Sequence, residues 1–333
     1  MQRQIKQSSV ILCLAFLCAI ILIGFLYYLS TQMFQAADTS ELKEEKPDTV
    51  ILVSDAIADQ SWGSHAHHSR LRVEEKFGIK AELFSGLVTE TLREYRTVKE
   101  ADNGRDLIIG HGREYTEVFN DIAASYPETK FVSLQGTPEH DNQAVYTYNN
   151  LEAEVQALLA GSIKSETKKI GVLSKEGDWK RHEEVETILQ ELCDETEVIH
   201  RTVESRNNKE EALQVLDELL AEGADVIYSR GNTFNRYVIE QAQVQDFYII
   251  GFITDQAYLA EEQMITSVLI DVPKIYEYIL EDYLSRDGLG SGVYDLTNQE
   301  GRNISSTGDL GPMFTDTDKE ELAEKLQDFP DKQ

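Results

Sequence analysis

The sequence contains little cysteine. Only 3 of its 333 residues are cysteine, and Cys13 and Cys18 both lie in an apolar run near the start of the chain. Cys193 is alone in the remainder, so no disulfide can form within that part. Its surroundings are typical of a helix, which predicts a small, buried side chain. We therefore expect the fold to be stabilised by its apolar core, for which a hydrophobic content of 41% is sufficient.

Positive charge is also scarce. The chain has 31 Lys and Arg residues against 60 Asp and Glu residues, which gives a net charge of −29. Such a surface repels the phosphates of nucleic acids and anionic lipid headgroups. We therefore expect no direct binding of nucleic acid. The acidic surface is otherwise typical of a highly soluble domain.

Several catalytic and cofactor-binding signatures are missing. The sequence has no His-Glu-x-x-His or cysteine-rich metal pattern, and no Gly-x-Ser-x-Gly that would hold a nucleophilic serine on a sharp turn. The stretch "IIGHGREY" (108–115) resembles a phosphate-binding turn before a helix, but it lacks the Gly-x-Gly-x-x-Gly spacing. We expect no enzymatic activity and no cofactor.

Histidine is concentrated in "SHAHH" (64–68). His65 and His68 are three residues apart and would share one face of a helix, whereas His67 points elsewhere. Two imidazoles do not complete a metal site, and a third ligand would have to come from His111 or a carboxylate. We expect a solvated helix surface; metal binding and a change of charge near neutral pH are the alternatives.

The chain begins with a segment that predicts a membrane anchor. Residues 10–29 form an uncharged apolar run of the length that a helix needs to span about 30 Å of hydrocarbon. Basic residues precede it and acidic residues follow, which places residues 1–9 in the cytoplasm. Residues 30–48 read as a polar linker. We expect a single-pass protein of the cell membrane with its large domain extracytoplasmic; a cleaved secretory signal is the alternative.

From residue 49 onward, short apolar runs alternate with amphipathic stretches. This alternation predicts an α/β fold with parallel sheets and right-handed crossovers. Two such series predict two doubly wound lobes, with lobe 1 at residues 49–147 and lobe 2 at residues 148–254. Residues 255–333, which include the strand-like "MITSVLID", are expected to return to lobe 1 and end in a tail with a last acidic helix at residues 316–327.

Polar and aromatic residues that follow the predicted strands form the candidate ligand site. In open α/β sheets, ligands bind outside the carboxyl ends of the strands. The candidates are Asp55, Asp59, Trp62, His111, Arg230, Asn232, Phe234 and Asp255. Alternatives remain for four of them. Asp59 and Asp255 could cap helices through their carboxylates, and Trp62 and Phe234 could belong to the core.

Several segments, read in order, resemble the basic membrane protein family of extracytoplasmic substrate-binding proteins, whose best understood members bind purine nucleosides for import. The segments are "DQSW", "LIIGHGREYTEVFNDIAASYPETKF", "EAEVQALLAGSIKSETKKIGVLS", "EGADVIYSRGN" and "YIIGFITDQAYLAEEQMITSVLIDVPKIYEYI". The resemblance runs from about residue 49 to the end. It implies a type I periplasmic-binding-protein-like fold. Within the family, the chain looks closest to a membrane-associated branch of bacilli that positively regulates competence genes.

The resemblance also implies roles for single residues. Trp62 corresponds to the aromatic that stacks on the base, and Phe234 to a second aromatic from the other lobe, so that a planar ligand would be sandwiched. In "GFITDQ" the family's first Asp is replaced by Ile253, while Asp255 is retained. In "TSVLID" the family's Lys is replaced by Ile270. Two positions that hold ribose are therefore apolar here, which predicts weak nucleoside binding.

These observations predict a membrane-anchored binding protein rather than an enzyme. We expect it to act in competence regulation by sensing a small ligand or a partner in a cleft between the lobes. The alternative is a receptor that delivers a nucleoside-like ligand to an ABC importer. The implied partners are the membrane, through the anchor, and either a membrane protein or an ABC permease.

Overall fold

The computed structural model describes residues 46–57, 62–177, 179, 182–231, 233–297 and 302–329. The chain divides into two compact units, Met1–Lys46 and Pro47–Gln333. The predicted cytoplasmic segment, the predicted anchor and most of the predicted linker lie outside the described residues. Among helices in the described ranges, none combines the length and apolar character needed to cross a membrane.

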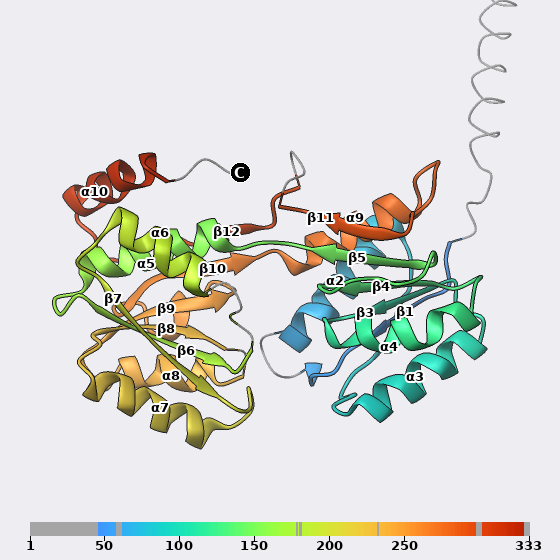
Figure 1. Ribbon diagram of the computed structural model, residues 1–333, viewed down its shortest axis with the longest axis horizontal. Helices are drawn as coiled ribbons and strands as arrows, with labels where there is room; N and C mark the ends of the chain where they lie inside the picture. The colour runs from blue at the N-terminus through green and yellow to red at the C-terminus, as the bar shows by residue number, and fades with distance from the viewer. Residues whose placement is uncertain are drawn as a thin grey trace, which may run out of the picture. The chain divides into compact units, whose positions relative to one another are not determined.

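Pro47–Gln333 contains two lobes, each built on a six-stranded sheet with helices on both faces (Figure 1). All strand pairs in the first sheet are parallel, as the alternation of strands and helices predicted. Its strands are, in spatial order, β11 (Gly292–Asp295), β5 (Gln143–Thr147), β4 (Lys130–Leu134), β3 (Leu107–Gly110), β1 (Thr49–Leu52) and β2 (Glu82–Phe84).

The second sheet is parallel except at one edge. There, the short strand β12 runs antiparallel to β10. Its strands are, in spatial order, β12 (Ser305–Thr307), β10 (Met264–Ile270), β9 (Tyr248–Ile253), β8 (Val226–Arg230), β6 (Lys169–Lys175) and β7 (Glu197–Val203).

Helices cover both faces of the first sheet because successive strand residues point to opposite sides. Ile51 packs with residues of α2 and α9, whereas its neighbour Val50 packs with residues of α3 and α4. Two apolar layers result, and the strands are buried on both faces. The helices of this lobe are α2 (Trp62–Phe77), α3 (Glu90–Asp102), α4 (Glu114–Ile122) with the short η2 (Ala123–Ser125), and α9 (Val272–Tyr283).

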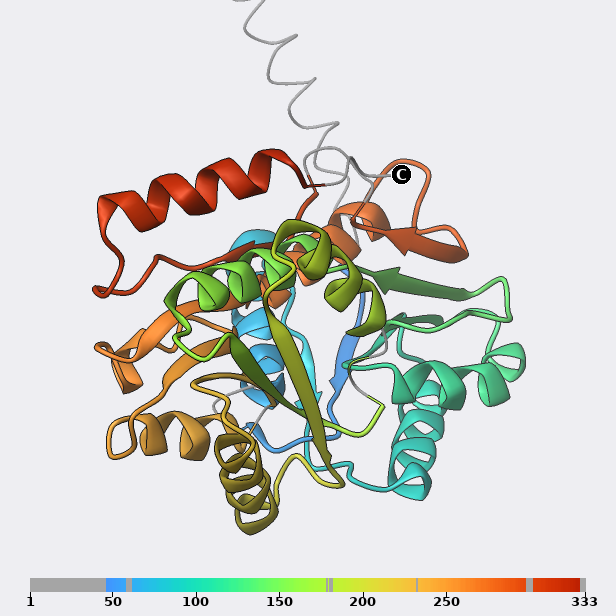
Figure 2. The same ribbon diagram turned by 60° about the vertical axis from the view of Figure 1, so that its left-hand side comes forward.

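Successive strand residues of the second lobe also point to opposite faces of the sheet, and helices cover both faces. Val172 and Val226 face the layer of α5, α6 and α10, while Leu173 and Ile227 face α7 and α8. Figure 2 shows α10 beside α5, where Leu322 joins the core. The elements here are α5 (Leu151–Lys164), α6 (His182–Leu192), α7 (Lys209–Ala221), α8 (Asn235–Ala242), η3 (Ala257–Leu259) and α10 (Asp316–Gln327). The predicted last helix is thus confirmed as α10.

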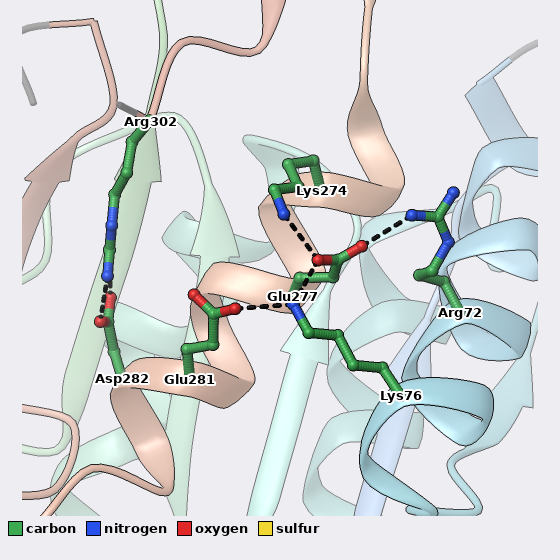
Figure 3. Close-up of polar contacts among 7 residues, drawn as sticks. All are labelled: Arg72, Lys76, Lys274, Glu277, Glu281, Asp282 and Arg302. Carbon is green, nitrogen blue, oxygen red and sulfur yellow. Dashed lines mark hydrogen bonds and ion pairs between the residues drawn. The ribbon is translucent and has the colours of Figure 1, made fainter. Parts of the chain in front are cut away.

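A buried carboxylate joins α2 to α9 in the first lobe. Figure 3 shows Arg72 and Lys76 of α2, together with Lys274 of α9, directed at Glu277. The Glu277 side chain is 4% exposed, and its three partners lie 2.6 to 2.8 Å away. Burial alone would raise the pKa of Glu277, but the hydrogen bonds from these cations hold it at about 2. The carboxylate is therefore ionised at neutral pH and links the two helices.

The chain passes between the two sheets three times. The first crossing leads from β5 to α5, the second from β10 to α9, and the third from β11 to β12. Asp271 caps α9 at the second crossing, because its carboxylate accepts a hydrogen bond from the Lys274 backbone N–H.

The expectation that residues 255–333 return to lobe 1 is wrong for β10, β12 and α10, and also for the short η3, which contacts α8 and β10. β10 pairs with β9, β12 pairs with β10, and α10 packs on α5, so all three belong to the second lobe. Of the helices and strands that the structure describes in this segment, α9 and β11 return to the first lobe. The sequence shows that "MITSVLID" is a strand, but the choice of sheet depends on pairing between distant segments, which local pattern does not contain.

Candidate functional site

Trp62 and His111 form a stacked pair at the carboxyl ends of β1 and β3. Their ring centroids are 4.4 Å apart with an interplanar angle of 30°. The Trp62 indole Nε1 donates to the carbonyl oxygen of His111 at 3.1 Å. Trp62 is the first residue of α2 and is only half-buried, so part of the residue stays accessible to solvent. The placement of Trp62 at a strand-end edge agrees with the sequence prediction, while ligand contact by it stays a prediction.

His111 is completely buried, and both ring nitrogens are engaged. Nε2 lies 2.8 Å from the carbonyl oxygen of Trp62, which can only accept, so Nε2 carries the hydrogen. Nδ1 then accepts from the Tyr276 hydroxyl, also at 2.8 Å. Burial lowers the pKa of His111 to about 3, although the hydrogen bond to Trp62 acts in the opposite direction. His111 is a neutral core residue that supports Trp62, with no side-chain surface left for a ligand.

Asp55 lies directly after β1 and is half-buried. Its carbonyl oxygen accepts from the Gly86 backbone N–H at 3.0 Å, which fixes the turn behind the strand. Burial raises the pKa of the nearby Tyr115 hydroxyl, while the Ser54 hydroxyl acts against that shift. Asp55 thus lies where the carboxyl end of β1 meets the apolar cluster that contains Tyr115.

Arg230 ends β8 in the second lobe and is held by a buried acid. Its Nε lies 2.5 Å from Oε1 of Glu154, whose side chain is 3% exposed. Glu154 also accepts from the Tyr228 hydroxyl at 2.8 Å and from the Trp179 indole at 3.2 Å. The Arg230 guanidinium lies over the Phe252 ring, 4.8 Å from its centroid. This network orients Arg230 at the predicted edge, although only 10% of its side chain is exposed.

The structure places Phe234 differently from the predicted ligand sandwich. The ring is completely buried in the core of the second lobe. It covers Gly231 so closely that a Cβ there would lie 2.1 Å from its atoms. A ligand stacked on Trp62 therefore cannot reach this ring in the arrangement seen here, and the core alternative holds for Phe234.

Asp255 lies one residue before Gln256, the N-cap of η3, so the helix-cap alternative that the sequence left open is met only in part. It is exposed, and its Oδ1 accepts from the Ala257 backbone N–H at 3.0 Å, at the start of η3. The next residue, Gln256, is buried. Its Oε1 accepts from the Phe252 backbone N–H at 3.0 Å, and its own backbone N–H donates to Ser267. These two hydrogen bonds of Gln256 stabilise the turn after β9. This role was not predicted from the sequence.

Asp59 and Asn232 lie outside the described residues, so their predicted roles stay predictions. The histidine stretch does lie on a helix, since "SHAHH" belongs to α2. The prediction of a solvated helix surface for this stretch was only partly right, because His68 is exposed whereas His65 is buried, with 7% of its surface exposed. No group of three or more His, Cys, Asp or Glu side chains arranged to hold a metal occurs in the described ranges.

Tyr148 stands at the first crossing, between residues of both lobes. Burial raises its pKa to about 12, and the positive charges of Arg230 and Arg113 act against that shift. Arg230 comes from the second lobe, and Arg113 precedes α4 in the first. One arginine from each lobe thus comes into electrostatic range of the Tyr148 side chain.

Glu154, Trp179 and His200 were not among the sequence candidates. Trp179 is 2% exposed and meets the His200 ring edge-on, with centroids 5.0 Å apart. The His200 Nε2 lies 2.8 Å from the Ser174 hydroxyl, and burial lowers the pKa of His200 to about 4. Glu154 is the only acid among the buried positions of α5, and an acid within a mostly apolar stretch was the available signal.

The second lobe also contains a cavity of about 390 Å³ away from these strand ends. It lies at the opposite edge of the sheet, where Lys168 precedes β6 and Cys193 follows α6. Cys193 is half-buried there, with its sulfur 3.1 Å from the Ser162 hydroxyl. The prediction of a small buried side chain on a helix is therefore only partly right.

Ile253 and Ile270 occupy the positions where the resemblance implies ribose-holding side chains. Each is 4% exposed and belongs to the core cluster of the first lobe. Ile253 has φ +75°, which a β-branched residue rarely adopts and which costs about 1–3 kcal/mol. Burial of its side chain contributes a similar amount, roughly 1.5–3 kcal/mol. Neither side chain can form a hydrogen bond, so neither can hold a hydroxyl of a ligand.

Two doubly wound lobes joined by three crossings, with polar and aromatic side chains at their strand ends, define a two-lobed binding protein of the substrate-binding class. Residues 46–299 match the family of ABC transporter substrate-binding proteins described as PnrA-like, and the chain belongs to this family. Its members are solute-binding components of transport systems rather than enzymes.

Two relatives extend the comparison. The transcriptional activator protein Med of Bacillus subtilis (strain 168) is 26% identical over 284 residues, which cover 84% of this chain and 87% of that protein. Basic membrane protein A2 of Borrelia garinii subsp. bavariensis is 26% identical over 258 residues, which cover 74% of this chain and 75% of that protein.

Solved structures agree with the fold. A transcriptional activator of the comK gene from Bacillus halodurans matches with a TM-score of 0.72 at 25% identity, over 84% of this chain and 96% of that one. An ABC transporter solute-binding protein from Aeropyrum pernix K1 matches with a TM-score of 0.68 over 84% of this chain and 85% of that one. The latter is 18% identical, so it shows the fold alone.

Proposed function

We propose that this chain is a membrane-anchored, extracytoplasmic protein of the substrate-binding family that positively regulates competence gene expression. Residues 10–29 would hold it in the cell membrane, with the two lobes outside the cell. A small ligand or a partner engages the strand-end edges of the lobes and shifts an open–closed equilibrium.

The observation that carries this proposal is the similarity to two transcriptional activators, Med of Bacillus subtilis and the comK activator of Bacillus halodurans, along most of the chain. The half-buried indole of Trp62 supports a ligand-contacting role at the first lobe. With the two lobes outside the cell, the signal would reach transcription through a membrane partner or by an indirect route.

The proposal is tested in Bacillus subtilis cells that lack Med and carry a comK reporter. The full chain should restore reporter activity, and a form without residues 1–29 should not, because it is no longer held at the membrane. Immunoblots of both forms control for their amounts. Failure of the well-expressed full chain to restore the reporter would refute the regulatory role.

The alternative is a nucleoside receptor of an ABC importer, and the family match over residues 46–299 favours it. The apolar, buried Ile253 and Ile270 argue against it, since they offer no partner to ribose hydroxyls.

Calorimetric titration separates the two functions. We expect guanosine, adenosine and inosine to bind the purified chain more weakly than micromolar, because the ribose-holding groups are missing. Trp62→Phe keeps an aromatic ring and Trp62→Ala removes it, which makes them a matched pair. Micromolar binding by the parent chain that survives in Trp62→Phe and is lost in Trp62→Ala would establish the receptor instead.

A further inference from the structure

The three crossings between the lobes meet in one apolar cluster. Each crossing contributes residues to, or packs against, the core of the first lobe. We call this group the hinge core; its crossing residues are Tyr148, Ile270, Val272, Leu296 and Ile304. The second and third crossings are also joined directly, because the Asp271 backbone N–H donates to the Ile304 carbonyl at 2.8 Å.

Ile253 enters the hinge core without belonging to a crossing. It ends β9, a strand of the second lobe, and the chain continues from it into η3 of the same lobe. Phe252, the residue before it, is partly buried and packs against the cores of both lobes, whereas Ile249 and Ile250 are completely buried in the cores of the second lobe. Ile253 pairs with Leu269, so it stands beside Ile270 at the second crossing.

The backbone of Ile253 adopts a conformation that its side chain disfavours. At φ +75° the β-branched side chain crowds the backbone, and such strain persists only where surrounding contacts determine it. The contact present here is burial in the core of the first lobe, at 4% exposure. Withdrawal of Ile253 from that core would release the strain but expose the side chain. The two effects oppose each other, and burial holds the observed state.

We propose that Ile253 is a latch, a positioning residue of the second lobe whose insertion into the hinge core fixes the angle between the lobes without a ligand. Lobe movement then requires Ile253 to leave the cluster. The inference goes beyond the proposed function, because it holds whichever ligand or partner engages the strand-end edges.

The latch is tested by the distribution of distances between spin labels on the two lobes. The full chain, with Cys13, Cys18 and Cys193 changed to Ser, carries labels at Tyr95→Cys and Val244→Cys. These side chains are 62% and 76% exposed. We expect a narrow distribution for this parent. Ile253→Gly accepts the positive φ and removes the side chain, so it should broaden the distribution and add a second population.

Two further variants make the result specific. Ile253→Val keeps most of the buried side chain and should broaden the distribution less than Ile253→Gly. Ile250→Ala removes a side chain from the same strand but from the core of the second lobe alone, and it should leave the distribution unchanged while it lowers the melting temperature. An unchanged distribution in Ile253→Gly, or equal broadening in Ile250→Ala, would overturn the latch.

Discussion

His111 is held neutral by burial, and its ring connects three elements of the first lobe. It follows β3, donates to the first residue of α2 and accepts from Tyr276 of α9. A buried imidazole with two satisfied nitrogens stabilises the fold as long as it remains uncharged. Its role is therefore to position Trp62, and this role depends on pH.

The free energy of unfolding should decrease as the pH falls, because burial lowers the pKa of His111. The pKa of His111 is about 3 in the folded chain against 6.5 for the free group, so below pH 6.5 the unfolded chain binds a proton that the folded chain does not. The loss of folding stability caused by His111 therefore grows as the pH falls from 6.5 towards 3. Urea unfolding at pH 7, 5.5 and 4.5 should show a falling free energy of unfolding for the parent chain.

Replacement of the histidine isolates this contribution. His111→Phe should lower the free energy of unfolding at pH 7 by about 1–3 kcal/mol, because Tyr276 and the Trp62 carbonyl lose their partner. It should also flatten the decline between pH 6.5 and 4.5. His68→Phe changes an exposed histidine of α2 and serves as the control, with the parental slope. An equal slope in parent and His111→Phe would contradict this account.

At the residue scale, the sequence predicts which side chains follow strands but not how deeply each is buried. Trp62 and Arg230 lie at strand ends as expected, while Asp255 accepts from the first backbone N–H of η3 without being its N-cap residue. Phe234 looked similar to Trp62 in sequence. The missing side chain of Gly231 lets its ring fold back into the core, a contact that strand-end position does not reveal.

At the scale of elements, the α2–α9 pair is organised around one carboxylate. Glu277 belongs to a helix that is otherwise buried among apolar residues, and its charge is balanced from two helices. The pair carries Trp62 at the start of α2 and Tyr276 one residue before Glu277. The ion pairs and the candidate site therefore share the same two helices.

Glu277→Ala should destabilise the first lobe. Removal of a buried acid leaves three cations close together, but each is 33% to 47% exposed and can turn to water. We therefore expect a loss of about 1–3 kcal/mol at pH 7, below that of a fully buried pair. Urea unfolding measures it.

The control for this variant is Glu281→Ala, which removes an acid that is 37% exposed and pairs with Lys76. It should cost less than about 1 kcal/mol. The stability that Glu277 contributes is present above pH 4.5 and is lost as the pH falls from 4.5 to 2, since its folded pKa lies below that of the free group. Equal losses in the two variants would contradict a special role for Glu277.

The sequence predicted most strands and helices because each buried strand and amphipathic helix carries its own periodicity. The sequence assigned β10 to the wrong lobe, because a parallel strand pairs with neighbours that are distant in the sequence. The ion pairs of Glu277 were equally inaccessible, because Arg72 and Glu277 are 205 residues apart.

At the scale of the whole molecule, the predicted anchor determines where two acidic lobes can act. Residues 10–29 are apolar, whereas the chain as a whole has a net charge of −29. Such a domain does not adhere to anionic lipids by itself, so a membrane location would depend on the anchor.

Cell fractionation checks this dependence. The full chain should sediment with membranes and resist extraction by high salt, and deletion of residues 1–29 should move it to the soluble fraction. Protease added to spheroplasts should digest the lobes of the full chain if they face outward. Sedimentation of the truncated form with membranes would show that another surface of the protein binds them.

The three crossings have a consequence for the order in which the chain can fold. The first lobe receives α9 and β11 only after the whole of β6 to β10 has been made, and the second lobe receives β12 and α10 last of all. A growing chain therefore cannot complete its first core, even with residues 49–147 already synthesised. Both lobes are completed only once residues 272–327 have been made, and a chain truncated before residue 272 lacks a helix that its first domain requires.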